Sequence, residues 1–220
     1  MLVYGKNVLR ELDKNKIKKI YVSSNDLIPY LENEGLKYDL VPKVKLDKMV
    51  HGNHQGIVID IHDYEYYKMD DIDSDFIVIL DHLEDPHNFG SIIRTCECVG
   101  AKNIIIPKDR SVSVNDTVVK VSTGAVEHVK IIMVNNLVQA INKLKDMNYF
   151  IYAADMDGED YRKVSYSSKK ALVVGNEGSG IGRLVKENSD VVVSIPMKGK
   201  INSLNASVAA SIILYGMIDE

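Results

Sequence analysis

Six short, almost uninterrupted apolar runs follow one another from residue 76 onward. Runs of this length suit strands that are buried on both faces, as in a largely parallel sheet. Helical patterns separate most of these runs, and such alternation is typical of an open α/β sheet whose ligand lies beyond the carboxyl ends of its strands. The expected strands are 76–80, 103–106, 129–134, 150–154, 171–174 and 191–195, and the expected helices are 91–99, 118–125, 137–147, 181–187 and 205–218.

The residues before position 76 have shorter elements and predict a separate, smaller domain. Residues 1–62 have the pattern of a small α/β unit. Residues 63–75 are acidic and have no apolar period of either kind, so we expect them to form a linker. The second domain then covers residues 76–220. The expected front elements are helices at 8–13, 26–34 and 46–50 and strands at 19–22, 38–41 and 56–61.

The net charge of −4 is unevenly distributed along the chain. Residues 1–48 carry 10 basic and 7 acidic side chains, whereas residues 49–75 carry 1 basic and 7 acidic side chains. This distribution excludes a uniformly basic nucleic-acid protein, but it leaves room for a basic face on the first segment. No apolar run approaches the ~20 residues that a membrane helix needs, and no secretion signal is recognisable at the start. We therefore expect a cytoplasmic protein with no membrane contact.

The loop expected after the first strand of the second domain, Asp81–Gly90, leads into a helix that carries Arg94. Asn88 lies just before that expected helix, where its side-chain amide can cap free N–H groups or meet a ligand. Arg94 follows about one turn into the helix and leans back toward the same crevice. The alternative is a capping asparagine with a surface pair between Arg94 and Glu97.

A glycine-rich loop, Gly175–Gly180, follows the expected strand 171–174. Glycines at such a turn let the backbone approach a ligand closely. The loop does not match a phosphate-binding loop, because Ile181 stands where that pattern requires lysine. Glu177 suits a hydroxyl, an amine or a cationic cofactor better than a phosphate. A tight turn with a solvated carboxylate is the alternative.

A third polar loop, Ile195–Ser207, joins the last expected strand to a strongly apolar helix. Ser203, or Asn202 before it, is a good N-cap residue. Capping does not account for all the polar residues between two apolar elements. Buried polar groups need partners, and a bound ligand could supply them.

Together these loops resemble the three motifs of the SpoU (TrmH) family, which are RNA ribose 2′-O-methyltransferases of the SPOUT superfamily. The matching residues are N-x-G-x-x-x-R from Asn88 to Arg94, then Gly175–Gly178, then Ile195–Met197 with Ser203–Ser207. In the front segment, Tyr4-Gly5 and His54–Val58 resemble the small RNA-binding domain of the branch that methylates a guanosine in 23S rRNA.

The resemblance implies features that the apolar pattern cannot reveal. The expected fold is a mostly parallel α/β sheet with a C-terminal trefoil knot, preceded by a small L30e-like RNA-binding domain. The expected assembly is a homodimer packed through the knotted domain. The expected methyl donor is S-adenosylmethionine without a metal, and the expected partner is RNA, most closely 23S rRNA.

The resemblance also assigns roles to residues. Because an arginine stays protonated in nearly any protein environment, we expect Arg94 to act as an electrostatic clamp on a developing alkoxide rather than as a base. The implied catalytic residues are Asn88, Arg94, Glu177, Ser203 and Asn205, and the implied cofactor-binding residues are Gly175, Ile195, Met197 and Leu204.

Four lysines of the front segment are candidates for contacts with RNA phosphates, with a solvated face as the alternative. They are Lys14, Lys16, Lys18 and Lys19.

Two other functions stay open at this point. The same chemistry could act on tRNA, or the scaffold could serve as a non-catalytic RNA-binding factor in ribosome assembly. The sequence has all three of Asn88, Arg94 and Glu177. This argues against a non-catalytic factor, because a site without activity would not need to keep these residues together.

Overall fold

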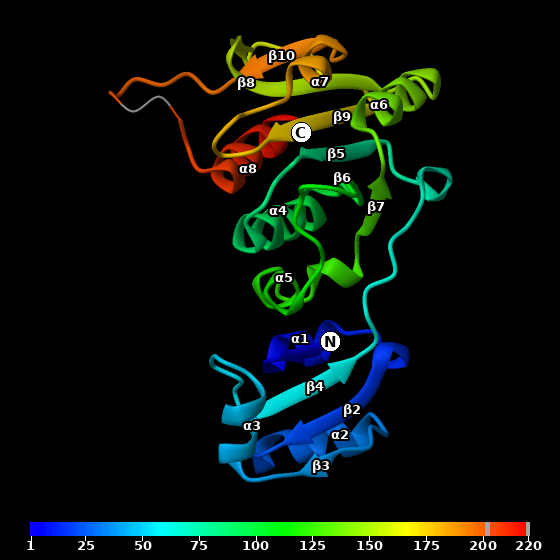
Figure 1. Ribbon diagram of the computed structural model, residues 1–220, viewed down its shortest axis with the longest axis vertical. Coiled ribbons are helices and arrows are strands. Elements are labelled where there is room, and N and C mark those ends of the chain that lie inside the picture. Colours follow the sequence, from blue (N-terminus) through cyan, green and yellow to red (C-terminus); the bar gives the residue numbers. More distant parts are fainter. Residues whose placement is uncertain (201–202, 219–220) are drawn as a thin grey trace. The chain divides into compact units, whose positions relative to one another are not determined.

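The computed structural model describes residues 1–200 and 203–218, and the chain divides into two compact units (Figure 1). Unit 1 comprises Met1–Glu65 and Val114–Glu127. Unit 2 comprises the described residues of Tyr66–Ser113 and His128–Glu220. No helix in the described part of the chain is long and apolar enough to cross a membrane.

Unit 1 is built on a four-stranded sheet in the order β1-β4-β2-β3. Strand β4 pairs antiparallel with both β1 and β2, and β3 pairs parallel with β2. The fully buried side chains of Val3, Ile20, Leu31 and Ile59 form part of its core. The elements are β1 (Leu2–Tyr4), α1 (Lys6–Glu11), β2 (Ile17–Val22), α2 (Ile28–Asn33), β3 (Asp39–Leu40), α3 (Lys43–Met49), β4 (Ile57–Ile61) and α5 (Asp116–Val121).

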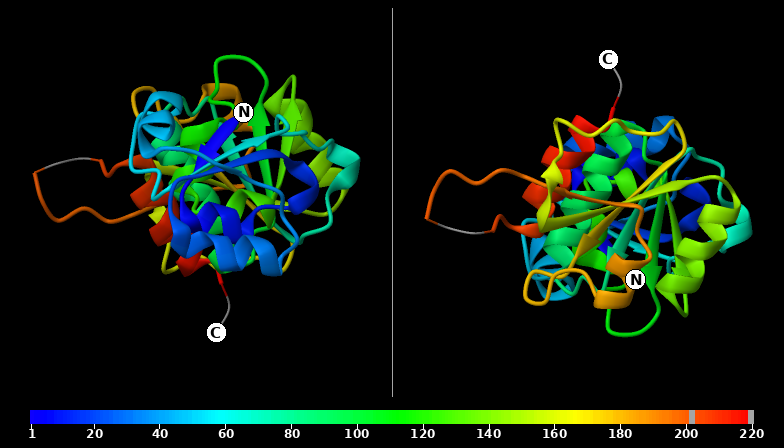
Figure 2. Two further views of the ribbon diagram at one scale, coloured as in Figure 1. Left: turned by 90° about the horizontal axis from the view of Figure 1, so that it is seen from below. Right: turned by 90° about the horizontal axis from the view of Figure 1, so that it is seen from above.

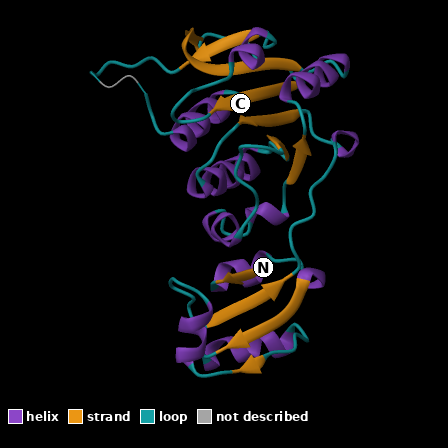
Figure 3. Cartoon of the chain, in the orientation of Figure 1, coloured by secondary structure: helices purple, strands orange, loops and turns teal. Residues whose placement is uncertain are grey.

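Unit 2 contains a six-stranded, entirely parallel sheet in the order β10-β8-β9-β5-β6-β7, so the predicted sheet is confirmed. Every residue of β5 and β6 is buried, as expected for strands covered on both faces. Figures 2 and 3 show α4 and α8 on one face of the sheet and α6 and α7 on the other. The elements are β5 (Phe76–Asp81), α4 (Pro86–Val99), β6 (Asn103–Pro107), β7 (Lys130–Val134), α6 (Leu137–Asp146), β8 (Phe150–Asp160), β9 (Lys170–Gly175), α7 (Arg183–Glu187), β10 (Val191–Ser194) and α8 (Ala206–Gly216).

The segment Val114–Glu127, which the sequence placed in the second domain, belongs to unit 1. Glu127 forms an ion pair with Lys16 at 2.6 Å. Gly124 lies so close to α1 that an added Cβ would be 2.4 Å from the Cβ of Glu11. These contacts join residues more than 100 positions apart, and no local pattern encodes them.

The predicted linker 63–75 is structured from Tyr67 onward. Tyr67 forms a parallel bridge with Ile132. The fully buried Asn103 side chain accepts hydrogen bonds from the backbone N–H groups of Asp73 and Ser74, at 3.0 and 3.1 Å. Hydrogen bonds from Lys130 and Asn103 lower the pKa of Asp73. The backbone of this part is therefore hydrogen-bonded to unit 2, while the carboxylates of Asp70, Asp73 and Asp75 stay largely exposed.

The N-terminal caps of helices α4 and α8 differ from the prediction. Helix α4 begins at Pro86, because the Asp85 carboxylate caps it by accepting from the His87 N–H at 2.9 Å. Asn88 consequently lies inside the first turn and not before the helix. Helix α8 is capped by Asn205, which accepts from the N–H groups of the second and third residues that follow it. Ser203 is therefore not the cap, and Asn202 lies outside the described residues.

Candidate active site

The side chain of Asn88 joins the three loops that the sequence singled out. Its Nδ2 donates a short hydrogen bond to Glu177 Oε1, in the loop after β9. Its Oδ1 accepts from Asn205 Nδ2 at 2.9 Å, at the N-terminus of α8. Asn88 is only 6% exposed, so both ends of a buried amide are satisfied by residues of the other two loops.

The parallel register explains why the first two loops meet. Asp81 at the end of β5 lies opposite Gly175 at the end of β9. The carboxylate of Asp81 is almost fully buried, and its Oδ2 accepts from the Gly182 N–H at 2.6 Å. Its Oδ1 lies 2.5 Å from His82 Nδ1. Asp81 therefore anchors the far end of the glycine-rich loop to the neighbouring strand.

The loop Gly175–Gly180 closes on itself. Asn176 and Gly180 exchange two backbone hydrogen bonds at 2.9 and 3.2 Å, and Asn176 Nδ2 donates to the His82 carbonyl at 2.8 Å. An added Cβ at Gly175 would lie 2.3 Å from the carbonyl carbon of Gly180. Only glycine permits this close backbone approach.

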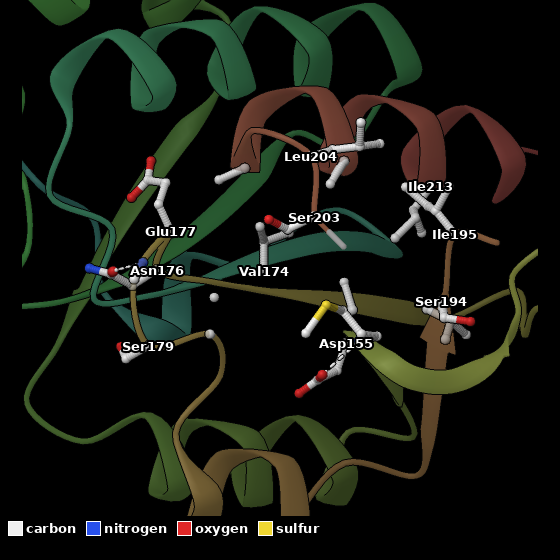
Figure 4. Close-up of a pocket in the computed structure, with 18 of the residues that line it drawn as sticks. Asp155, Val174, Asn176, Glu177, Ser179, Ser194, Ile195, Ser203, Leu204 and Ile213 are labelled. Carbon is white, nitrogen blue, oxygen red and sulfur yellow. Dashed lines mark hydrogen bonds between the residues drawn. The ribbon is translucent and has the colours of Figure 1, made fainter. Parts of the chain in front are cut away.

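A cavity of about 400 Å³ opens at the carboxyl ends of β9 and β10 and beside the middle of β8 (Figure 4). Apolar side chains, among them Val174, Leu204 and Ile213, form much of its wall. Two carboxylate side chains, Asp155 and Glu177, also line it, whereas no lysine or arginine of the described chain does. This lining favours an apolar or cationic ligand and disfavours a phosphate.

Asp155 is part of a small ionic cluster at the cavity wall. Lys186 of α7 contacts Asp155 at 2.9 Å and Asp157 at 2.6 Å. Hydrogen bonds to Asp157 and Asp155 raise the pKa of Lys186. Sequence reasoning missed Asp155, although the signal was available: polar residues follow the apolar run 150–154 as they follow the other strands.

The structure brings most of the predicted site residues together. Arg94 is the exception: it is exposed on α4, does not line the cavity, and makes no ion pair with any described residue. The alternative pair of Arg94 with Glu97 is therefore not formed. The residues that line the cavity are Gly175, Glu177, Ile195, Met197, Ser203 and Leu204, and Asn88 and Asn205 are hydrogen-bonded beside it.

Three of the four candidate RNA-binding lysines have carboxylate partners. Lys16 pairs with Glu127, Lys19 lies 2.8 Å from an Asp39 oxygen, and Lys14 pairs with Glu34. Hydrogen bonding to Asp39 raises the pKa of Lys19. Lys18 is exposed and makes no ion pair within the part of the chain that the structure describes. The run therefore has less free positive charge than its sequence suggests.

The chain matches two family models. One, described as the SpoU rRNA Methylase family, matches residues 75–215. The other, described as RNA 2′-O ribose methyltransferase substrate binding, matches residues 2–67. One model thus matches the predicted front domain, and the other matches the predicted second domain.

Similar proteins agree with these matches. YacO of Bacillus subtilis (strain 168), named as a member of the TrmH family of tRNA/rRNA methyltransferases, is 42% identical over 97% of this chain and 93% of its own length. A structure of an AdoMet-bound rRNA methyltransferase from Sinorhizobium meliloti has a TM-score of 0.82 and 26% identity, and the match covers 98% of this chain and 85% of that one. A TrmH/SpoU tRNA modifying enzyme from A. aeolicus has a TM-score of 0.61 and 34% identity, over 66% of this chain and 74% of that one.

Replacing Asn88 by Ala is expected to loosen the site without unfolding unit 2. The variant leaves the Glu177 carboxylate and the Asn205 amide without their shared partner. Loss of a hydrogen bond to a charged group costs roughly 1.5–3 kcal/mol of stability. We expect amide hydrogen exchange at residues 176–182 and 205–208 to accelerate about tenfold. Asn142→Ala on the exposed face of α6 is the control, and equal exchange in both variants would contradict the bridging role of Asn88.

Proposed function

This chain belongs to the SpoU rRNA methylase family of RNA methyltransferases, and from that premise we propose that it methylates a ribose 2′-hydroxyl of RNA. The observation that supports this most directly is the convergence of Asn88, Glu177 and Asn205 beside a cavity whose lining includes no positively charged side chain of the described residues. The donor that we propose is S-adenosylmethionine, because the lining fits it. That molecule has a sulfonium cation, a flat base and no phosphate.

The cavity residues would hold this donor. The volume of about 400 Å³ lies in the range of roughly 300–1,000 Å³ that is usual for small-molecule sites. Ile195, Met197 and Leu204 offer apolar surface for the base, and the bare backbone at Gly175 lets the ligand approach closely. When bound, the sulfonium supplies an activated methyl group for in-line attack by an oxygen.

The chain's own residues would orient the acceptor and stabilise charge. Asn88 fixes the Glu177 carboxylate at the cavity rim, where it can hold a ribose hydroxyl or the donor's cation. Ser203 lies on the same lining. Arg94 carries a permanently charged guanidinium that pairs with no carboxylate of the described residues, on the helix that also carries Asn88. We assign it to the developing alkoxide and the adjacent RNA phosphate, where a positioned cation lowers the barrier.

The RNA that we propose is a guanosine in 23S rRNA. The S. meliloti rRNA methyltransferase matches 98% of this chain, including unit 1, whereas the A. aeolicus tRNA modifying enzyme matches only 66%. Possession of the front unit therefore favours rRNA over tRNA. A tRNA ribose methyltransferase is the second candidate, and a non-catalytic assembly factor is disfavoured by the intact site.

We also propose that unit 1 is L30e-like and that the chain of unit 2 is knotted near its C-terminus. Gly216 at the end of α8 lies against Tyr161, which follows β8; an added Cβ would be 2.5 Å from the tyrosine ring. The Lys170 ammonium at the start of β9 donates to the Met217 carbonyl at 2.6 Å. The end of α8 thus lies against the β8–β9 connection, which supports the proposed knot.

The homodimer is part of the same proposal. Helix α8 is strongly apolar, yet Val208 and Tyr215 are 47% and 55% exposed. A second copy would cover these side chains, since contiguous exposed apolar surface usually marks an interface. Sedimentation velocity of the purified chain measures this state directly.

Calorimetry tests the donor site. We expect the wild-type chain to bind S-adenosylmethionine and Gly175→Ala to lose at least about tenfold in affinity, because the new Cβ forces the loop open. Gly199→Ala is the matched control, since an added Cβ there meets nothing within 4 Å. Absence of uptake by the wild-type chain would favour the non-catalytic assembly factor.

Arg94→Ala is expected to lower kcat by about 100-fold, the usual effect of removing one group that stabilises transition-state charge. Its affinity for S-adenosylmethionine should stay within about twofold of wild type, because Arg94 does not line the cavity. Single-turnover methylation of RNA, with calorimetry alongside, measures both quantities. Methylation at the wild-type rate would remove Arg94 from the mechanism.

Mapping of ribose methylation across total RNA identifies the substrate. In a strain that lacks this gene, we expect one 2′-O-methyl mark on a 23S rRNA guanosine to disappear and to return when the gene is restored. Loss of a tRNA mark instead would support the second candidate. If ribose methylation were unchanged at every position of the RNA, both the rRNA and the tRNA methyltransferase hypotheses would be contradicted.

A further inference from the structure

Lys120 occupies an unusual position in unit 1. It lies on α5, in the segment Val114–Glu127, and its ammonium contacts the aromatic ring and the hydroxyl of Tyr4. The Nζ atom is 4.3 Å from the ring centroid and donates to Tyr4 Oη at 3.0 Å. Tyr4 itself is only 6% exposed, so the lysine stem and ammonium cover a buried ring. The contact fixes a cation at a defined place on the surface of unit 1.

The charge of Lys120 is not neutralised by a neighbour. Lys16 and Lys19 of the same unit also lie over tyrosine rings, but each is paired with a carboxylate. Lys120 makes no ion pair with any residue in the described ranges 1–200 and 203–218. It is half-buried, and two of its three N–H donors have no acceptor there. A partly desolvated cation of this kind is stabilised when an anion approaches.

A glycine turn brings bare backbone against this cation. The Tyr4 hydroxyl donates to the His51 carbonyl at 3.3 Å. An added Cβ at Gly52 would lie 2.5 Å from Tyr4 Oη and 3.2 Å from Lys120 Nζ, so only glycine lets the turn come this close. Residues 51–53 are exposed. Within the described chain, the N–H groups of Gly52 and Asn53 donate to no acceptor.

Proteins build phosphate sites from backbone N–H groups and a lysine ammonium. Here the position of a Cβ on Gly52 lies 3.2 Å from the Lys120 ammonium, and the N–H groups of Gly52 and Asn53 belong to the same turn. The turn is open to solvent on a surface, and a single lysine with two amides is a weak site for free phosphate. A polymer adds such a contact to the others that it makes, so one additional phosphate contact still raises its affinity.

We propose that Lys120 and the backbone of Gly52 and Asn53 bind a phosphodiester of the RNA substrate. The inference rests on the proposed function only in taking RNA as the substrate. The proposed RNA contact lies on unit 1. Its lysine belongs to α5, which in the sequence lies between β6 and β7 of unit 2. Tyr4 is the positioning residue that holds the ammonium at the turn.

Salt-dependent RNA binding tests this site. Filter binding of a 23S rRNA transcript, and in parallel of a tRNA transcript, gives the affinity of each variant over a range of potassium chloride concentrations. Loss of one phosphate contact makes the slope of log K against log salt shallower by about 0.7–0.9. We expect Lys120→Met to show this change, with an affinity about fivefold lower at low salt. Lys120→Arg should keep the wild-type slope.

Lys130→Met is the matched control, because Lys130 also lies over a tyrosine ring, that of Tyr67, but is paired with Asp73 at 2.7 Å in unit 2. It should leave the slope unchanged. Thermal melting followed by circular dichroism verifies folding, and Lys120→Gln replaces Lys120→Met if the latter unfolds.

The outcomes separate the two proposals. A wild-type slope for the neutral Lys120 variants overturns the phosphate site, even if their affinity falls, because such a loss reflects structure and not charge. If the wild-type chain still methylates RNA in that case, the proposed function stands without this contact. Binding of neither RNA by the wild-type chain overturns both.

Discussion

The buried amide of Asn88 is the interaction on which the site depends. An amide side chain has both donors and an acceptor, so it can join a carboxylate on one side to another amide on the other. Here it connects Glu177 with Asn205, and thereby the first turn of α4 with the loop after β9 and the cap of α8. Neither Glu177 nor Asn205 is buried, so the rigidity of the rim comes from the one residue of the three that is. The Asp81 carboxylate holds the other end of the same loop through Gly182.

The polarity of the cavity is set by the side chains on and just after strands β8, β9 and β10. Val174 near the end of the buried strand β9 and the fully buried Val193 of β10 continue the core into the cavity wall. The only ionisable lining side chains of the described chain are the carboxylates of Asp155 and Glu177. A sheet of the same parallel class could have carried a lysine-containing phosphate loop at this edge. The absence of that lysine from the lining, together with the family, makes a sulfonium donor a better fit than a nucleotide.

Unit 1 changes the interpretation of the basic front segment. A run of lysines is a natural candidate for RNA contacts, yet Lys14, Lys16 and Lys19 are each held by an acidic residue. Lys120, from a distant part of the chain, has an ammonium over Tyr4 and no carboxylate partner among the described residues. The charge available for binding therefore depends on how acidic partners are distributed in space and not on how many lysines follow one another.

The amino-acid sequence by itself determined the strands and most helices, because apolar periodicity and burial on both faces are local properties. The runs at 76–80 and 171–174 became β5 and β9. The second and third polar loops line one cavity, and Asn88 of the first is hydrogen-bonded to residues of both. Local reasoning placed the start of α4 too late, since the Asp85-Pro86 cap was overlooked, and it missed Asp155. Only the tertiary structure decided that α5 belongs to unit 1, that Asn88 bridges Glu177 and Asn205, and that Arg94 stays outside the cavity lining. Those outcomes depend on contacts between residues about 90 to 120 positions apart, whose free energy is set by packing and pairing across the fold and leaves no periodic trace in the chain.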